Sequence, residues 1–341
     1  MDIGRAISSS LGGLPLRCLL ALAIGANASA GVTFRVTFQD SESLLTPRRA
    51  EIESNVLGAA GLWSKKLHGE TELWIEVHPG VNASDVDCRS FTWSYLETLE
   101  GAIDIFETGS SVHIRNGYPA SSFDPDIILE ISPVFAQNDL WFDPDPVART
   151  AAVDSARIDA VSQFARGLGR ALAFDGWVDS TTGTFPGSSR STFDQLISFN
   201  GTDFAFVGSN AVTTYHAPVP MTFGVPFRIG NEPPRPGTDL LNDVMSGASL
   251  VPGVRYTVSD LDFAILQDAH VPINLPCPCD INGDGLVDDA DFFTFTSSYD
   301  AYECSVPSMP AGCPCDFNRD EVVDDADYVT FISSYDQLLC P

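Results

Sequence analysis

Basic residues are scarce in this sequence. Its 341 residues contain 18 Lys and Arg against 46 Asp and Glu, and the formal net charge is −28 at pH 7. This excess of negative charge argues against nucleic acid or an anionic membrane surface as a partner, because like charges repel. Histidine is scarce too: the five histidines stand singly and show no metal-binding spacing.

Common catalytic signatures are also missing. The sequence has no GxSxG nucleophile elbow, no phosphate-binding loop and no dinucleotide-binding fingerprint. Beyond residue 30, no stretch approaches the roughly 20 apolar residues that a membrane-spanning helix requires. The composition is nevertheless 44% hydrophobic and 10% aromatic. That is enough for a buried core, and the length allows two domains.

Residues 1–30 have the pattern of an export signal. Two arginines precede an apolar run at 18–26, and the small residues ASA at 28–30 form a cleavage site. The mature chain is then expected to begin at Gly31. The sequence therefore predicts a secreted protein, in the extracellular space or associated with the cell surface.

The last part of the chain is one unit written twice. CPCDINGDGLVDDADFFTFTSSYDAYEC runs from Cys277 to Cys304, and CPCDFNRDEVVDDADYVTFISSYDQLLC runs from Cys313 to Cys340. The offset is a constant 36 residues, and 18 of 28 positions are identical. A duplication kept so well in register predicts one module, residues 277–341, built from two copies.

Each copy places oxygen-bearing side chains at the spacing of a calcium-binding loop. Loop positions 1, 3, 5, 9 and 12 carry a carboxylate or an amide, and position 7 offers its backbone carbonyl. The expected ligands are Asp280, Asn282, Asp284, Leu286, Asp288 and Asp291 in the first copy and Asp316, Asn318, Asp320, Val322, Asp324 and Asp327 in the second. Position 6, where the loop turns, is Gly285 in one copy and Glu321 in the other. We therefore expect two bound Ca²⁺ ions, the second in a somewhat strained loop.

An apolar helical stripe follows each loop, made of Phe292, Phe295 and Tyr299 in the first copy and Tyr328, Phe331 and Tyr335 in the second. Paired half EF-hands, an aspartate at position 12 and a helix after the loop resemble a dockerin module. The framing cysteines match the dockerins of some secreted bacterial proteins better than cellulosomal ones. The resemblance implies a small all-α domain that docks onto a cohesin-like or cell-surface scaffold protein. The alternative is a solvated acidic tail.

Six of the seven cysteines beyond the export signal belong to the repeat: Cys277, Cys279, Cys304, Cys313, Cys315 and Cys340. In an oxidising compartment they are expected to form disulfides, although the sequence permits 15 connectivities. The repeat symmetry favours closure of Cys304 and Cys340 onto a cysteine of their own Cys-Pro-Cys, with the remaining two bridging the copies. A zinc site is the alternative for the same six. Cys88 is expected to be a buried free thiol.

Residues 31–271 mix strand and helix patterns, which predicts an α+β domain with an irregular C-terminal half. Strands are expected at 32–38, 72–77, 111–115 and 126–131, helices at 47–68, 95–105, 155–174 and 260–269, and an edge element at 140–146. Residues from about 175 to 258 are rich in Gly, Pro, Ser and Thr and are expected to hold few regular elements. A short linker, 272–276, would tether the repeat module closely.

The stretch VSQFARGLGRALAFDGW, residues 161–177, resembles the active-site helix of zincin-type metallopeptidases. Secreted bacterial metzincin-like enzymes read HExxHAxGFxGW at this place. WFDPDPVARTAA, STFDQLI and NDVMSG with SDLDFAILQDA resemble the segments around that helix, the methionine turn and the closing helix. The resemblance covers most of 32–268. It implies a zincin-like fold with a mixed sheet, an active-site helix and Met245 as the turn methionine.

The positions that would perform the chemistry are changed. The family's first zinc histidine falls on Arg166, its general base on Gly167, its second histidine on Arg170 and the metzincin third ligand on Gly176. A zinc peptidase needs neutral imidazoles to hold the metal and a carboxylate to accept a proton. Arginine offers only donors and a permanent charge, and glycine offers no side chain. We therefore expect no zinc and no peptidase catalysis at this helix.

Two roles remain open for Arg166 and Arg170. In the first, they form salt bridges with acids of the former cleft, Asp175 or Asp179 being nearest in sequence, and replace the metal as a structural tie. In the second, they clamp a carboxylate of a peptide or acidic ligand bound in the degenerate cleft.

The expected protein is a secreted, non-catalytic relative of metallopeptidases, anchored or assembled through a calcium-binding dockerin-like module. The alternative is a secreted hydrolase, either a peptidase or a polysaccharide-degrading component, with an atypical active site. A third reading is a folded shell that has lost its histidines.

Overall fold

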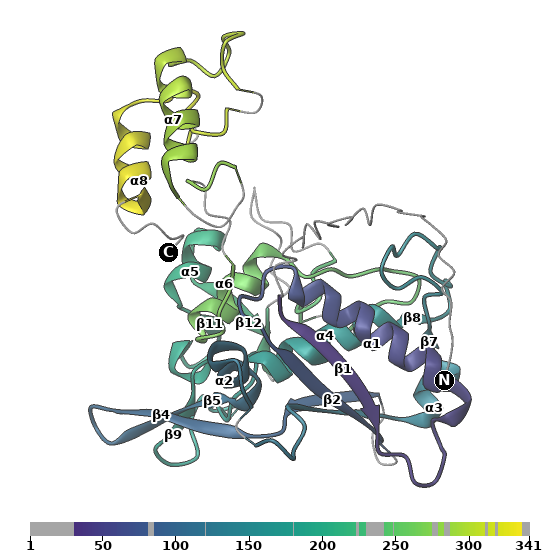
Figure 1. The fold of residues 1–341 in the computed structure, drawn as a ribbon. Coiled ribbons are helices and arrows are strands. Elements are labelled where there is room, and N and C mark those ends of the chain that lie inside the picture. The colour runs from purple at the N-terminus through teal and green to yellow at the C-terminus, as the bar shows by residue number, and fades with distance from the viewer. Residues whose placement is uncertain are drawn as a thin grey trace, which may run out of the picture.

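The structure is a computed structural model. It describes residues 31–80, 85–119, 121–179, 181–222, 225–229, 242–247, 249–274, 279–282, 287–310, 313–317 and 320–335. These residues fold as a mixed α+β protein with several sheets, shown in Figure 1. Among them, no helix has both the length and the apolar character needed to cross a bilayer. The expected export signal lies outside the described residues.

A four-stranded sheet in the order β1-β2-β6-β3 organises the larger part of the chain. β1 (Thr33–Phe38), β2 (Glu72–Pro79) and β6 (Ile127–Ile131) are parallel. β3 (Val86–Ser90) pairs antiparallel with β6 and forms one edge. Four of the five side chains of β6 are buried, as in a strand covered on both faces.

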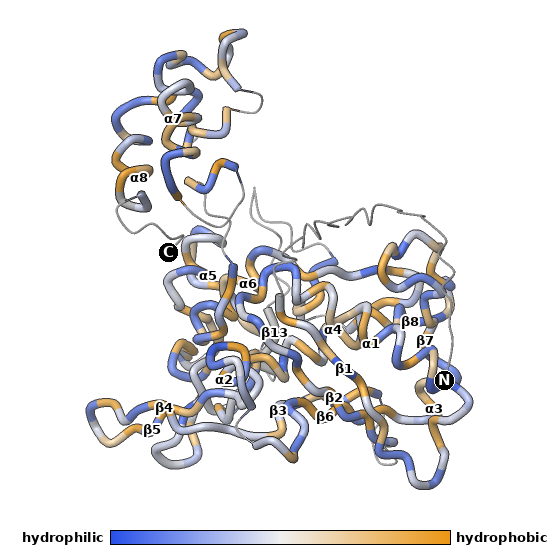
Figure 2. The backbone as a smooth tube through the Cα atoms, viewed as in Figure 1, coloured by the Kyte–Doolittle hydropathy of each residue, from blue (hydrophilic) through white to orange (hydrophobic). Residues whose placement is uncertain are grey.

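Helices α1 (Arg49–Ser64) and α4 (Ala160–Leu172) cover one face of this sheet, because α1 packs on β1, α4 packs on β3, and the two helices contact each other (Figure 1). The buried indole Nε1 of Trp63 in α1 donates to the carbonyl oxygen of Ala165 in α4 at 2.9 Å. Figure 2 shows apolar residues gathered along these helices and the central strands. The core of the larger part therefore lies between the sheet and this helix pair.

The remaining elements are short. A three-stranded sheet contains β4 (Trp93–Leu99), β5 (Ile103–Thr108) and β9 (Ser189–Ser191), and an antiparallel sheet contains β10 (Ile197–Phe199), β11 (Phe204–Phe206), β12 (Val219–Thr222) and β13 (Val225–Ile229). A two-stranded pair contains β7 (Leu140–Trp141) and β8 (Ile158–Asp159). The other helices are α2 (Gly109–Asn116), α3 (Pro133–Asn138), α5 (Ser209–Tyr215) and α6 (Asp260–Asp268), with 3₁₀ turns at Thr46–Arg48 and Asp194–Leu196.

The strongest sequence patterns predicted their elements correctly. The expected strands at 32–38, 72–77 and 126–131 are β1, β2 and β6, and three of the expected helices are α1, α4 and α6. The ends differ by a few residues, most at α4, which begins after the short strand β8. The expected edge element at 140–146 is strand only over β7. Strand β3 was not expected, since its sequence, VDCRS, has no clear period.

Residues 95–105 form a hairpin instead of the expected helix. β4 and β5 pair antiparallel, and the chain reverses at Gly101 and Ala102, whose φ angles are 87° and 58°. Two consecutive residues with positive φ form a turn whose twist suits antiparallel strands. The geometry of this turn therefore overrides the apparent helical spacing.

The expected strand at 111–115 is part of helix α2. The Thr108 side chain caps its first turn by accepting a hydrogen bond from the Ser111 amide, and Gly117 ends it with a φ of 75°. Such caps satisfy backbone groups at both helix ends, so they stabilise a helix over a short alternating pattern. In the stretch from 175 to 258, expected to hold few regular elements, the described residues form five short strands and α5.

The repeat contributes two helices, α7 (Asp289–Ala301) and α8 (Asp325–Tyr335), which carry the expected apolar stripes. Phe295 and Phe331 occupy equivalent positions in the two copies and are buried against each other, with ring centroids 4.7 Å apart. The buried side chains of the repeat form a hydrophobic cluster distinct from that of the larger part. The two copies thus share one small core.

Crossed hydrogen bonds reinforce this pairing. The Tyr299 hydroxyl of the first copy donates to Asp325 of the second at 2.6 Å, and the Tyr335 hydroxyl of the second donates to Asp289 of the first at 2.5 Å. The hydrogen bond to the carboxylate raises the pKa of each tyrosine, because ionisation would break that bond, and the negative charge of the carboxylate adds to the rise. Each helix therefore fixes the first turn of the other.

The packing beneath α4 generates a prediction about Gly169. A Cβ at this position would lie 2.7 Å from the Met245 sulfur and 2.8 Å from the Trp63 ring. Gly169→Ala should therefore lower the free energy of unfolding by about 1–3 kcal/mol, as overpacking does, in urea denaturation. The matched control is Gly61→Ala in α1, where a Cβ would meet nothing within 4 Å. There alanine should stabilise by up to about 1 kcal/mol, and equal effects at both positions would contradict the packing described.

Candidate functional site

Arg166 lies in the middle of α4 and is buried, with 5% of its surface exposed. Its Nε donates to the carbonyl oxygen of Val244 at 2.7 Å, and its Nη2 donates to that of Ser246 at 3.0 Å. These two carbonyls flank Met245, which is fully buried. The guanidinium group thus joins α4 to the turn at 243–246 through two charge-assisted hydrogen bonds.

Arg170, one helical turn later, makes ion pairs with two carboxylates. Its Nη1 lies 3.3 Å from Asp87 of β3, and its Nη2 lies 3.5 Å from Asp175, just beyond α4. Burial raises the pKa of Asp175, and the guanidinium charge opposes that rise. Arg170 therefore links α4 to the edge strand and to the segment that follows the helix.

The glycines at the other two degenerate positions are in close contact with neighbouring residues. A Cβ at Gly167 would lie 2.8 Å from the Cβ of Cys88 in β3, and one at Gly176 would lie 2.1 Å from a carboxylate oxygen of Asp194. Real Cβ atoms do not approach other atoms so closely. A glutamate at 167 therefore requires β3 to move, and a histidine at 176 requires the Asp194 carboxylate to move. The space that a catalytic side chain would need is filled.

The contacts of both arginines match the first of the two roles considered above, in which they link parts of the protein to one another and bind no ligand. Asp175 is a partner of Arg170, as the sequence suggested, and Asp87 was not foreseen because it lies far away in the chain. Asp179 instead accepts hydrogen bonds from Thr181 and Thr182 in its own turn, and these bonds lower its pKa. Arg166 is held by backbone carbonyls, which no side-chain pattern could reveal.

A pair of buried acids lies close to Arg166. Asp243 begins the turn at 243–246, and Asp262 lies in the first turn of α6. Ser259 connects them, since its hydroxyl donates to Asp243 at 2.6 Å and its amide donates to Asp262 at 3.0 Å. Burial raises the pKa of Asp243 to about 6 and that of Asp262 well above its usual range, where the charge of Asp243 adds to the rise. Arg166 opposes both shifts.

One histidine takes part in a hydrogen-bonded row of largely buried side chains that the sequence did not indicate. His113 of α2 has its Nδ1 2.8 Å from Asp126 and its Nε2 2.7 Å from the Thr71 hydroxyl. The second oxygen of Asp126 accepts from the amide of Trp74 at 2.8 Å. The row joins α2 to the start of β2, and its three members come from separated segments, so no local motif marks it.

In the acidic loops, the residues at position 12 are fully buried. Asp291 accepts hydrogen bonds from the amides of Ile281, Asn282 and Asp288 at 2.7–3.1 Å. Asp327 makes the equivalent bonds to the amides of Phe317 and Asp324 at 2.7 and 3.0 Å. Each carboxylate thus holds the start and end of its loop together, with its charge inside the protein.

The second loop turns at Glu321, which has a φ of 74°. This left-handed conformation costs a residue with a Cβ roughly 1–2 kcal/mol, so the expected strain is present. Asp316, at position 1, accepts from the amides of Asp320 and Glu321 at 3.1 and 3.0 Å. Its carboxylate therefore faces into the loop, as a side chain that coordinates a cation there must do.

The donor chemistry of both loops suits a hard cation. Carboxylate oxygens predominate among the described positions, and Ca²⁺ prefers oxygen ligands. The described candidates are Asp280, Asn282, Asp288 and Asp291 in the first loop and Asp316, Asp320, Val322, Asp324 and Asp327 in the second. Asp284, Leu286 and Asn318 lie outside the described residues.

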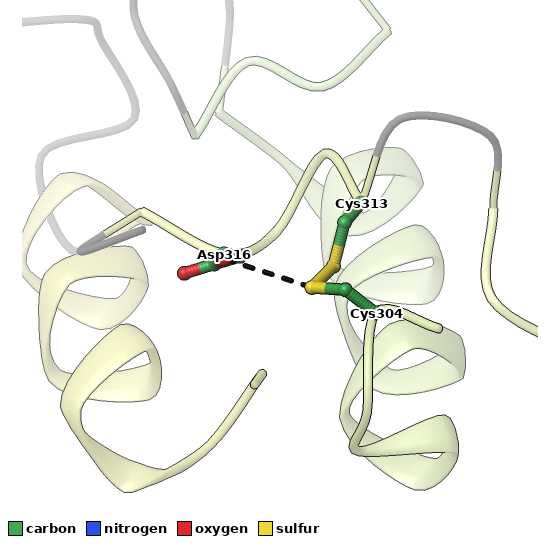
Figure 3. A group of neighbouring side chains, drawn as sticks. All are labelled: Cys304, Cys313 and Asp316. Carbon is green, nitrogen blue, oxygen red and sulfur yellow. Dashed lines mark hydrogen bonds between the residues drawn. A yellow bond between two sulfur atoms is a disulfide. The ribbon is translucent and has the colours of Figure 1, made fainter. Parts of the chain in front are cut away.

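The cysteine pairing differs from the expectation. Cys304 forms a disulfide with Cys313, the first cysteine of the second copy, and not with a cysteine of its own Cys-Pro-Cys (Figure 3). The two are only 9 residues apart, and their Cα atoms lie 5.3 Å apart, because the connection between the copies folds back. The Cys304 sulfur also lies 3.6 Å from Asp316. Since both sulfurs are in the disulfide, this trio is a covalent tie and not a thiolate metal site.

Three described cysteines are free. Cys88 is buried in β3, as expected, and burial raises its pKa. Cys279 and Cys315 are equivalent residues of the two copies, and both are buried thiols. Cys279 lies 3.7 Å from the Thr330 carbonyl of α8, and Cys315 lies 4.0 Å from the Thr294 carbonyl of α7. Cys277 and Cys340 lie outside the described residues.

Comparison with known proteins gives no assignment. No protein-family model, no curated protein and no solved structure matches this chain. The interpretation that follows rests on the residues themselves.

The buried acid pair generates a pH prediction. A carboxyl whose pKa is raised in the folded state binds its proton more tightly there than in the unfolded chain. The free energy of unfolding therefore falls as pH rises from about 4 through 6, by about 1.4 kcal/mol for each unit of raised pKa. Asp262→Asn keeps an oxygen for the Ser259 amide and removes one charge from the pair. We expect a smaller loss of stability between pH 5 and 7.5 in this variant.

Urea denaturation at several pH values measures the difference. The control is Asp260→Asn, which changes an exposed carboxylate on the same helix that pairs with Lys66. Its pH dependence should stay close to that of the wild type. Parallel pH profiles for Asp262→Asn and the wild type would show that protonation of Asp262 does not contribute to the pH dependence of stability.

Proposed function

We propose that this protein is a secreted, non-catalytic relative of zincin metallopeptidases that is anchored or assembled through a calcium-binding, dockerin-like module. The observation that carries the proposal is the state of α4. Both arginines at the degenerate histidine positions are engaged with protein groups, and a Cβ at either degenerate glycine would clash. The helix therefore acts as a structural element.

The fold supports the relationship to zincins. The sheet is mixed, with one antiparallel edge strand, and α4 packs directly on that strand. Met245 lies beneath α4, where the resemblance puts the turn methionine, since a Cβ at Gly169 would touch its sulfur. The closing helix α6 carries a capping box at Ser259 and Asp262. These features agree with the order of segments in the sequence.

The clamp in which Arg166 and Arg170 hold an acidic peptide has less support. A guanidinium group that already donates to carbonyl or carboxylate oxygens must give up those bonds to bind a ligand, which costs about what the new bonds return. Only Arg170 is within reach of solvent, with 32% of its side chain exposed. A peptide in the degenerate cleft would therefore depend on groups other than Arg166.

The repeat supports the calcium module. Burying a carboxylate is costly unless hydrogen bonds or opposite charge compensate it. Asp291 and Asp327 have no exposed surface, and backbone amides compensate part of this cost, so opposite charge would lower it further. Bound Ca²⁺ would supply that charge, with the oxygen donors of each loop as ligands. A cohesin-like or cell-surface scaffold protein is the partner that the dockerin resemblance implies.

Metal analysis of the purified full chain tests the proposal. We expect about two calcium ions per chain, no stoichiometric zinc and no cleavage of peptide substrates. Calcium at about 100 times its dissociation constant should stabilise the repeat by about 3 kcal/mol for each site, and EGTA should abolish this. Asp291→Asn should weaken the effect, whereas Asp300→Asn, an exposed position on the same helix, should not. Stoichiometric zinc together with chelator-sensitive proteolysis would overturn the proposal.

The alternative, a hydrolase with an atypical site, is favoured by one observation. The row from Thr71 through His113 to Asp126 has the connectivity of a nucleophile, a base and an orienting acid. A screen with ester and peptide substrates distinguishes a catalytic row from a structural one. Turnover that disappears in Thr71→Ala would establish the hydrolase, while no turnover and a loss of stability in His113→Ala would identify a tie.

The strain at Glu321 generates a separate prediction. Glu321→Gly removes a Cβ from a left-handed residue, which should stabilise the loop by about 1 kcal/mol and tighten the second calcium site about fivefold. Calorimetric titration of calcium into the two proteins measures the change. The matched control is Glu303→Gly, since Glu303 is exposed and is not among the positive-φ residues. There glycine should give no gain. An equal gain at both positions would show that the left-handed conformation of Glu321 is not what weakens the second calcium site.

A further inference from the structure

Four aromatic rings form a connected group on the β4-β5-β9 sheet, and we call this group the aromatic platform. It consists of Trp93 and Tyr95 of β4, Phe106 of β5 and Trp177, which follows α4. The centroids of Trp93 and Trp177 lie 4.7 Å apart, those of Trp177 and Phe106 5.8 Å, and those of Phe106 and Tyr95 6.0 Å. None of the four belongs to either hydrophobic core or packs against one.

The strand register puts these rings on one face of the sheet. Tyr95 is directly opposite Phe106, and Trp93 is opposite Thr108, so their side chains share a face. Ile105 points to the opposite face and is fully buried. The platform face is open to solvent: Tyr95 is 58% exposed, and the other three rings are partly exposed. Figure 1 shows the β4-β5 hairpin extending away from the body of the protein.

A network of backbone hydrogen bonds holds Trp177 in the platform. The Asp194 carboxylate accepts from the amides of Trp177 at 2.8 Å, Val178 at 3.3 Å and Ser191 of β9 at 3.1 Å. The lack of a side chain at Gly176 lets that carboxylate approach. The segment after α4 is thereby fastened to the sheet, and the ring is preorganised before any ligand arrives.

A row of polar groups runs beside the rings. The register shifts between Tyr95 and Glu97, and this irregularity brings Thr98 onto the same face as Tyr95. The Tyr95 hydroxyl lies 2.8 Å from the Thr98 hydroxyl, which donates to Asp104 at 2.7 Å. The carboxylate of Asp104 has further acceptor capacity, because an ionised carboxylate can accept about four hydrogen bonds.

The surrounding charge restricts the kind of ligand. Residues 93–108 contain four acidic residues and no Lys or Arg. Phosphorylated, sulfated or carboxylated ligands would be repelled by such a surface. A large protein partner is also disfavoured, because Asp104 shares the platform face with the rings and charged side chains are depleted from the centres of protein interfaces.

We propose that the aromatic platform binds a neutral polysaccharide chain. The C–H faces of sugar rings are apolar and make dispersion and hydrophobic contacts with aromatic faces. Their hydroxyl groups donate to carboxylate and hydroxyl oxygens, which Asp104 and the Tyr95–Thr98 pair offer along the same edge. A rigid row of rings beside a row of acceptors fits a chain of repeating neutral units. This inference does not depend on the calcium module or on the state of α4.

Affinity electrophoresis of the full chain tests the proposal, in native gels that contain mixed-linkage β-glucan, arabinoxylan, galactomannan or glycogen. At least one of these polysaccharides should retard the wild-type protein. Tyr95→Ala and Trp93→Ala should each weaken the retardation at least about tenfold. Tyr95 is largely exposed, so its replacement leaves the fold intact, and circular dichroism checks this for both variants.

The control is Phe123→Ala, which removes an aromatic side chain that is 91% exposed outside the platform. It should bind as the wild type does, and EGTA should leave the retardation unchanged. Failure of all four polysaccharides to retard the protein would overturn the proposal. Equal losses in Phe123→Ala, or stronger retardation by the anionic polysaccharide heparin, would overturn it as well. A change in sedimentation coefficient in Tyr95→Ala without a change in retardation would identify the platform as a protein contact instead.

Discussion

The larger part of the chain depends on the hydrogen bonds that the buried guanidinium group of Arg166 donates. A permanent charge inside a protein is tolerated only where its hydrogen bonds are satisfied and opposite charge is near. Two carbonyls of the turn around Met245 meet the first need, and the acids Asp243 and Asp262 contribute to the second. One side chain thus fixes α4, the turn and the start of α6 relative to one another. A metal ion could make such a link with several ligands, whereas arginine makes it with donors alone.

Regular patterns in the sequence predicted the parts of the fold that local chemistry determines. β1, β2, β6, α1, α4 and α6 follow from periodicity, because each has one strongly apolar face or run. The β4-β5 hairpin and α2 were missed, since their identity rests on positive φ at Gly101 and on the cap at Thr108. The partners of Arg166 and the row through His113 involve residues far apart in the chain, and only the folded structure brings them together.

The repeat shows both the value and the limit of symmetry as a guide. Symmetry correctly predicted two helices with equivalent apolar stripes, and the structure adds crossed bonds from Tyr299 and Tyr335 that respect it. It failed for Cys304, whose partner Cys313 is near because the connection between the copies is short. The short connection therefore determines the partner of Cys304, although the contacts of the two copies are otherwise similar.

The contact between Gly167 and Cys88 couples two positions that are distant in the sequence. With only a hydrogen atom at 167, β3 approaches α4 until the Cys88 side chain fills the space between them. Any larger residue at 167 must push the strand outward, and Arg170 resists that movement through Asp87. Placing an acid at 167 by mutation therefore requires simultaneous changes in the strand, so a single substitution there gives a less stable protein.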